Sequence, residues 1–120
     1  MKTLITYVGS AAAELIDSGT LIMFNNTAPQ ELRNIAVIHD KQSDEKDILH
    51  KNGKFVINNK EYNIDFVGKV ANKNFNVLGH LSVYFNNKDE TGKLPGSIFV
   101  SGPVNPNIDD FKQGNLIQII

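Results

Sequence analysis

Apolar and polar residues alternate with a period of two over several short stretches of the chain. Every second residue is apolar in Glu61–Phe66 and again in His80–Phe85. Side chains alternate between the two faces of a strand, so this pattern is typical of half-buried strands. The continuous apolar run Ile35–Ile38 has the length of a fully buried strand. Few windows sustain the 3.6-residue period of an amphipathic helix, and the pattern therefore predicts a chain built mainly from strands.

Turn-forming residues separate the predicted strands. Asn52-Gly53 and Asn58-Asn59 are strong turn signals, because Asn and Gly tolerate a positive φ, and Asn58-Asn59 predicts a hairpin loop. Pro95-Gly96 and Gly102-Pro103 bracket a further strand. The expected strands are Lys2–Val8, Thr20–Phe24, Ala36–His39, Phe55–Ile57, Tyr62–Phe66, His80–Phe85, Ile98–Val100 and Leu116–Ile120.

Short helical segments interrupt the strands. We expect them at Ala11–Asp17, Gln30–Asn34 and, as a single turn, within Val70–Leu78. Ser10 is a candidate N-cap of the first helix, and Gly19 lies just beyond its end. Thr27 and Gln30 have the spacing of a capping box for the second helix. Helices this short are stable in water only when they pack against other elements.

Length and composition fit one folded domain. The chain has 120 residues, of which 41% are hydrophobic and 21% charged, as is ordinary for a soluble protein. We expect a single domain over residues 1–120 that is mainly β. Its predicted architecture is a mostly antiparallel barrel or sandwich with two or three short helices.

Charge and cysteine content argue against several classes of function. With 12 basic and 13 acidic residues the formal net charge is -1, so no excess of Lys and Arg would drive counterion release from a nucleic acid. The chain contains no cysteine, which excludes disulfides, thiolate catalysis and Cys-ligated metal sites. We expect no nucleic-acid partner.

No apolar run has the length of a membrane span. The longest, Leu21–Phe24 and Ile35–Ile38, have four residues each, against roughly 20 for a spanning helix. Near the N-terminus, Thr3 and Thr6 interrupt the apolar residues, whereas a signal peptide needs an apolar run of roughly 7–15 residues. We expect a cytoplasmic protein without direct membrane insertion.

Three histidines are the candidate reactive groups: His39, His50 and His80. His39 follows the apolar strand and precedes the polar stretch 40–47, which we expect to be a loop. A reactive group is well placed where a rigid strand meets solvent. The reference pKa of histidine is about 6.5, so a neutral ring nitrogen is available as a nucleophile at cytoplasmic pH. His39 is therefore the leading candidate.

Other catalytic signatures are missing from the sequence. The chain has no Walker-type phosphate loop, no G-x-S-x-G and no H-E-x-x-H. Asp109 and Asp110 are adjacent, so on a strand they would point to opposite faces, and we expect both to be solvated. Arg33 is the single arginine, which argues against an arginine clamp for a tightly held anion.

A series of short motifs runs in order along most of the chain. They are Tyr7-Val8-Gly9, Leu21-Ile22-Met23-Phe24, Ala28-Pro29-x-x-Leu32, Val37-Ile38-His39, Leu49-His50-x-x-Gly53, Val67-Gly68-x-Val70-Ala71, Leu78-Gly79-His80, Leu94-Pro95-Gly96 and Gly102-Pro103-Val104. In this order the sequence resembles the glucitol/sorbitol-specific IIA component of the bacterial phosphoenolpyruvate-dependent sugar phosphotransferase system (PTS). The resemblance extends to about Asn107.

The resemblance implies a phosphoryl relay through His39. His39 would accept a phosphoryl group from the phosphorylated histidine-containing phosphocarrier protein. It would pass the group to a cysteine of the IIB part of the IIB/IIC permease, which phosphorylates sorbitol during uptake. No cofactor is expected. Some relatives carry a second histidine two positions after the acceptor, and that position is Lys41 here.

Further residues are candidates for supporting this reaction. His80 is the preferred helper at the phosphoryl group, with Gly79 and His50 as further candidates. Charge-assisted hydrogen bonds contribute about 1.5–3 kcal/mol each, so many of them would hold the cargo too firmly for a relay. The acidic residues after His39 are candidates for steering a basic donor protein: Asp44, Glu45 and Asp47.

Two other functions are compatible with the same residues. The first is a small β-barrel that binds a ligand or senses the state of the phosphotransferase system without turnover. The second is a metal site built from His39, His50 and His80. Phosphorylation of His39 would favour the relay over both.

Overall fold

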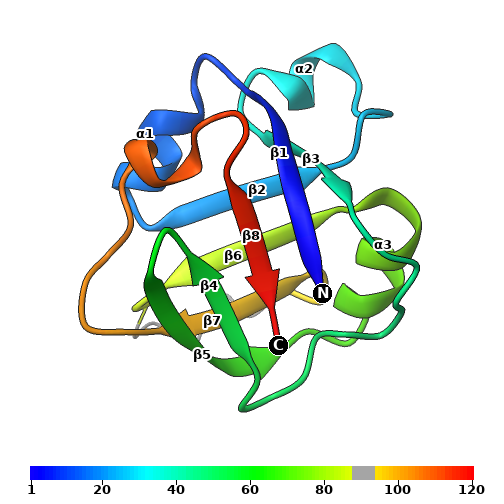
Figure 1. The fold of residues 1–120 in the computed structure, drawn as a ribbon, viewed down its shortest axis with the longest axis vertical. Coiled ribbons are helices and arrows are strands. Elements are labelled where there is room, and N and C mark those ends of the chain that lie inside the picture. Colours follow the sequence, from blue (N-terminus) through cyan, green and yellow to red (C-terminus); the bar gives the residue numbers. More distant parts are fainter. Residues whose placement is uncertain (88–93) are drawn as a thin grey trace.

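Eight strands close into a barrel in the computed structural model, which describes residues 1–87 and 94–120 (Figure 1). The strands are β1 (Lys2–Val8), β2 (Thr20–Phe24), β3 (Val37–Lys41), β4 (Lys54–Ile57), β5 (Lys60–Val67), β6 (Leu81–Phe85), β7 (Ser97–Ser101) and β8 (Leu116–Ile119). Their order around the barrel is β1-β3-β2-β6-β7-β5-β4-β8. The mainly β prediction is confirmed, with a barrel rather than a sandwich.

The barrel is mixed, although antiparallel pairing dominates. Only β2 with β3 and β6 with β7 run parallel among the described strands. A parallel pair needs a crossover between its strands, and α2 (Gln30–Arg33) lies in the connection from β2 to β3. The first and last strands, β1 and β8, pair antiparallel, and both chain ends lie near each other in Figure 1.

The alternating stretches bury their apolar faces inside the barrel. Leu81, Val83 and Phe85 of β6 are buried, as are Tyr62 and Ile64 of β5. The run before His39 is apolar on both faces for a different reason. Its outer side packs in a second cluster of buried residues, formed by Phe24, Ala28, Ala36 and Ile38.

β3 continues two residues beyond the predicted strand. The polar residues Asp40 and Lys41 pair with Leu4 and Thr3 of β1. The prediction of a loop starting at residue 40 is therefore wrong for these two positions. Backbone pairing with β1 holds them in the strand, and a hydropathy pattern does not record such pairing.

The described helices are short, and two predicted caps are wrong. In α1 (Ala12–Asp17) the N-cap is Ala11, and Ser10 makes no cap. In α2 the N-cap is Pro29, while Thr27 bonds to Asn25 Oδ1 instead. α3 (Ala71–Leu78) is longer than the single turn predicted. No helix within residues 1–87 and 94–120 is both long and apolar enough to cross a membrane.

The prediction that Asp110 is solvated is wrong. Asp110 is 3% exposed and lies in a 3-10 turn, η2 (Ile108–Phe111), that was not predicted. Its carboxylate accepts three hydrogen bonds: from Lys60 Nζ at 2.7 Å, from Asn58 Nδ2 at 2.9 Å and, in a capping box, from the Asn107 backbone amide at 3.0 Å. These charged and polar donors compensate its burial. Asp109 is exposed, as predicted.

Candidate functional site

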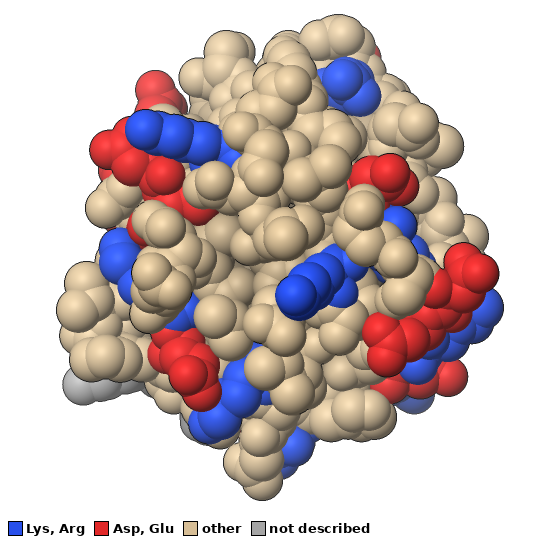
Figure 2. Space-filling model, viewed as in Figure 1, with Lys and Arg blue, Asp and Glu red and all other residues tan. Residues whose placement is uncertain are grey.

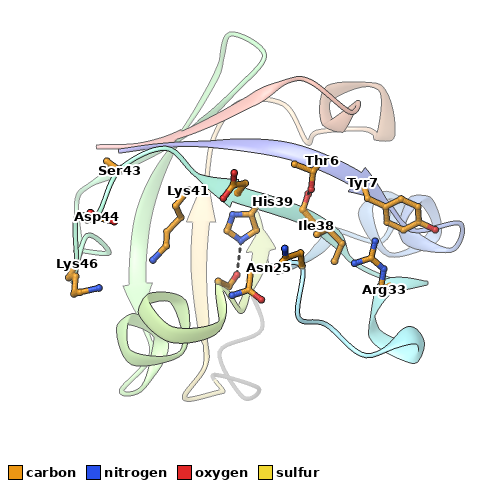
Figure 3. A pocket seen from close by; sticks show the side chains of 13 residues that line it. Thr6, Tyr7, Asn25, Arg33, Ile38, His39, Lys41, Ser43, Asp44 and Lys46 are labelled. Carbon is orange, nitrogen blue, oxygen red and sulfur yellow. Dashed lines mark hydrogen bonds between the residues drawn. The ribbon is translucent and has the colours of Figure 1, made fainter.

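A cleft of about 630 Å³ opens beside the end of β3 (Figure 3). Its walls come from β1, β3, the segment after β2, the loop after β3 and the residue that follows α3. His39 lies on its wall, and Figure 3 shows the ring projecting from β3, with a dashed line marking its hydrogen bond. The cleft therefore joins segments that are far apart in the sequence.

Strand pairing and an aromatic contact fix the His39 ring. His39 is opposite Ile5 in the β1–β3 register, and its ring stacks on Phe75 of α3 with centroids 5.5 Å apart. The residue is only 2% exposed. The prediction that His39 ends a strand at the solvent boundary is therefore wrong: His39 is the third of the five residues of β3, and its ring is covered, although the residue lines the cleft.

Both ring nitrogens of His39 have hydrogen-bond partners. Nδ1 lies 2.6 Å from Thr3 Oγ1, and Nε2 lies 2.7 Å from the Gly79 carbonyl oxygen. A carbonyl oxygen can only accept, so Nε2 donates to it. In the neutral ring Nδ1 is then the acceptor, and the Thr3 hydroxyl donates to it. The two partners together define one tautomer.

The surroundings favour a neutral ring. Burial lowers the pKa of His39, the hydrogen bond to the Gly79 carbonyl opposes this, and the Lys41 charge lowers the pKa further. The net direction is downward from the ordinary value of 6.5. A ring that stays neutral at physiological pH keeps one nitrogen lone pair, which nucleophilic chemistry requires.

Gly79 meets two local demands at once. It ends α3 in the left-handed conformation, with φ of 60°, where glycine avoids the steric cost of a side chain. A Cβ at this position would also lie 2.9 Å from His39 Nε2 and 3.2 Å from Asn25 Cβ. Glycine therefore keeps the space beside Nε2 open towards the cleft.

The cleft carries more basic than acidic side chains. Arg33, Lys41 and Lys46 line it together with Asp40 and Asp44. Lys41 Nζ lies 3.2 Å from the Asn76 carbonyl and 3.4 Å from the Phe75 carbonyl, at the C-terminal end of α3. The C-terminal end of a helix carries partial negative charge, so these carbonyls stabilise the Lys41 ammonium beside the cleft. Sequence reasoning did not identify Arg33, Lys41 or Lys46 as cleft residues.

The other two histidines are not brought to the cleft wall. The His80 ring packs on Phe24, with centroids 5.1 Å apart, and burial lowers its pKa. His50 is exposed in the turn before β4. Among residues 1–87 and 94–120, no three His, Asp or Glu side chains gather as metal ligands, so the described structure does not build the histidine metal site.

The three acidic candidates have different surroundings. Asp44 lines the cleft, Glu45 lies 3.6 Å from the N-terminal ammonium, and Asp47 bonds to the Asn76 side chain. On the face shown in Figure 2, acidic and basic residues are interspersed rather than segregated. Of the three, only Asp44 lies directly at the cleft.

A family model and two curated relatives identify one family. Residues 1–118 match the family model described as PTS system glucitol/sorbitol-specific IIA component. The PTS system glucitol/sorbitol-specific EIIA components of Shigella flexneri and Escherichia coli (strain K12) are each 32% identical over 117 residues, covering 98% of this chain and 91% of the relative. The crystal structure of a PTS system IIA component from Enterococcus faecalis V583 superposes with a TM-score of 0.85 at 22% identity, covering 100% of this chain and 99% of the other. This last similarity concerns the fold.

Proposed function

The chain belongs to the family of glucitol/sorbitol-specific IIA components of the PTS, and on this basis we propose that it is a cytoplasmic phosphoryl relay in sugar-alcohol uptake with His39 as its phosphoryl acceptor. The donor is the phosphorylated histidine-containing phosphocarrier protein. The recipient is a cysteine of the IIB component of the permease.

One observation carries the assignment to His39. It is the histidine that lines the cleft, where its neutral ring stands beside Gly79 and near the Lys41 ammonium. A phosphoryl group brings about -1.5 to -2 charges, and a basic cleft favours such a group. Because the cations are few and Asp40 and Asp44 lie among them, the site suits temporary rather than permanent retention.

The reaction exchanges one bond to phosphorus for another. A lone pair on His39 attacks the phosphorus of the donor phosphohistidine, and a nitrogen–phosphorus bond forms on His39. The bond between phosphorus and the donor nitrogen breaks, and the donor nitrogen keeps the electron pair, so that a donor ring protonated on its other nitrogen becomes neutral. In the second transfer a cysteine thiolate attacks the same phosphorus, and the His39 nitrogen keeps the pair released.

The rim of the cleft offers contacts for partner proteins. Val77 and Leu78, at the end of α3 next to Gly79, are 69% and 38% exposed. Exposed apolar residues beside a reactive group are typical of a docking surface. Asp44, Glu45 and Asp47 lie in the loop after β3 and supply negative charge for steering a donor with a basic rim.

A reconstituted transfer tests the relay directly. The chain is incubated with phosphoenolpyruvate, the first enzyme of the system and the phosphocarrier protein, and its intact mass is measured. We expect a gain of one acid-labile phosphoryl group that His39→Gln abolishes. His50→Gln should keep it, since His50 is exposed outside the cleft. His80→Ala tests the helper hypothesis, because a purely structural His80 would lower stability and leave transfer in the folded fraction intact.

The regulatory alternative has one observation in its favour. Both His39 nitrogens are hydrogen-bonded, and the ring is almost fully covered. A module that senses the state of the phosphotransferase system without turnover would bind the phosphocarrier protein and gain no mass. Binding without phosphorylation in the same assay would therefore replace the relay with this function.

A further inference from the structure

The two nitrogens of the His39 ring face different surroundings. Nε2 points to the Gly79 carbonyl, and Gly79 and Asn25 both line the cleft (Figure 3). Nδ1 points to the hydroxyl of Thr3, a β1 residue that is 0% exposed. A partner that reaches the ring through the cleft therefore meets Nε2, while Thr3 closes the approach to Nδ1.

The resting tautomer is unsuited to attack through the cleft. Since the Gly79 carbonyl only accepts, the proton of the neutral ring is on Nε2. The available lone pair is then on Nδ1, where it accepts from the Thr3 hydroxyl in the closed interior. For Nε2 to attack phosphorus, the ring must leave the Gly79 carbonyl and carry its proton on Nδ1 instead.

We propose that Thr3 is the positioning residue that permits this change: its hydroxyl donates to Nδ1 at rest and accepts from Nδ1–H during transfer, so that Nε2 carries the phosphoryl group. The inference rests on the proposed relay function. A hydroxyl suits both states because it is donor and acceptor, whereas a carboxylate would fix the proton on Nδ1 and a methyl group would satisfy neither state.

Protons and electron pairs balance in this scheme. The ring turns away from both the Gly79 carbonyl and the Thr3 hydroxyl, so that cleft water takes the proton from Nε2 and returns one to Nδ1 and the ring stays neutral. Nδ1–H then donates to the Thr3 hydroxyl. The Nε2 lone pair then forms the bond to phosphorus, and the donor nitrogen keeps the pair of the bond that breaks. The phosphorylated ring bears positive charge, and its Nδ1–H bond to Thr3 becomes charge-assisted.

Three variants test the inference on the full chain. Thr3→Val removes the hydroxyl with little change of shape, and Thr3→Ser retains it. The matched control is Ser97→Ala, which removes another buried strand hydroxyl, bonded to the Leu94 carbonyl at 2.7 Å and not to His39. The readouts are the rate of phosphorylation by the phosphocarrier protein, the ring ¹⁵N shifts of His39 and the nitrogen that bears phosphorus.

We expect the proton on Nε2 in the resting wild-type ring and, after transfer, phosphorus on Nε2 with the proton on Nδ1. Thr3→Val should slow phosphorylation about tenfold to a hundredfold, as expected for one lost charge-assisted hydrogen bond. Thr3→Ser should restore most of the rate, and Ser97→Ala should keep the wild-type rate.

Phosphorus on Nδ1, or a Thr3→Val rate equal to that of the wild type, would overturn the inference while leaving His39 as the acceptor. A His39 ring that takes no phosphoryl group in the wild-type chain would remove the proposed function and this inference together. Equal slowing in Thr3→Val and Ser97→Ala would also overturn it, because general loosening of the barrel would then explain the effect.

Discussion

The imidazole of His39 combines burial with neutrality. Loss of hydration lowers its pKa, and the Thr3 and Gly79 hydrogen bonds satisfy both nitrogens. A protonated ring would be costly in this position, since burial disfavours the charged form. At the scale of the residue, the site thus favours the uncharged form of the His39 ring and covers it with Thr3, Phe75 and Gly79.

This environment predicts a pH dependence of stability. With its pKa lowered from 6.5 in the folded state, His39 stabilises the fold fully above that pH. As the pH falls below 6.5, His39 is protonated in the unfolded chain but stays neutral in the folded chain. The free energy of unfolding then falls by at most about 1.4 kcal/mol per pH unit for one such group.

The measurement is denaturant unfolding between about pH 5 and pH 8, compared with His39→Gln. His80, whose pKa burial also lowers, contributes in the same direction and is present in both proteins. The difference between the two curves should therefore shrink as pH falls. A difference that is constant with pH would contradict a lowered pKa of His39.

Gly79→Ala should impair both folding and transfer. A non-glycine residue at its positive φ costs about 1–2 kcal/mol, and the added methyl group lies 2.9 Å from Nε2. Gly114→Ala is the matched control, because Gly114 also has a positive φ but its Cβ would meet nothing within 4 Å. Both variants are expected to lower the free energy of unfolding, Gly79→Ala more because of its close contact with Nε2, and only Gly79→Ala is expected to slow phosphorylation. Equal phosphorylation rates would show that the space beside Nε2 is not needed.

Sequence reasoning selected His39 as the leading candidate because an apolar strand directly precedes it, and His39 lines the cleft. It could not identify Thr3, because nothing in the local pattern distinguishes Thr3 from other strand residues. Its contact with His39 forms only when β1 pairs with β3 in the barrel. Lys41 was noted only as a departure from the family pattern, although it lines the cleft. The roles of these two residues depend on three-dimensional contacts that the local pattern does not encode.

At the scale of elements, α3 links the site to the loop after β3. Two side chains one turn apart hold that loop: Asn72 bonds to the Leu49 backbone, and Asn76 bonds to Asp47. This explains why the helix is longer than predicted. Asn has a low helix propensity, so the sequence indicated a single turn, but here its amides bond to the loop while the helix packs on the barrel.

The η2 turn depends on Asp110. Burial alone would raise the pKa of this carboxyl, but the bonds from Lys60, the Asn107 amide and Asn58 outweigh it and lower the pKa. Asp110→Asn should therefore reduce the free energy of unfolding by about 1.5–3 kcal/mol, the range for hydrogen bonds to charged groups. Urea denaturation at neutral pH measures the effect. Asp109→Asn, at the exposed neighbouring position, should be nearly neutral, and equal effects of the two would refute the buried network.

At the scale of the molecule, barrel closure assembles the site. Thr3 lies 36 positions from His39, and Gly79 lies 40 positions away on the other side. Alternating hydropathy predicted most strands and their turns, because each strand has one face in the core. It did not predict strand order or the two parallel pairs, since these follow from long-range pairing rather than from local pattern.

The net charge of the chain is only -1, so any electrostatic attraction of a partner protein has to come from charges near the cleft. Asp44→Asn, at the cleft, should slow phosphorylation by the phosphocarrier protein at low salt and have little effect at high salt, because salt screens exposed charges. Quenched-flow measurements of the phosphorylation rate at a series of salt concentrations test this prediction. Glu61→Gln, an exposed acid on β5, is the control. A rate for Asp44→Asn that equals the wild type at every salt concentration would exclude steering by this residue.

The most direct measurement locates the phosphoryl group itself. The chain is phosphorylated by the phosphocarrier protein, kept at alkaline pH and digested, and the modified residue is identified by mass spectrometry. The account predicts a single phosphorylated residue, His39, in the peptide that follows the buried strand run Val37-Ile38. A phosphoryl group on His50 or His80, or on no residue at all while the phosphocarrier protein is fully charged, would contradict it.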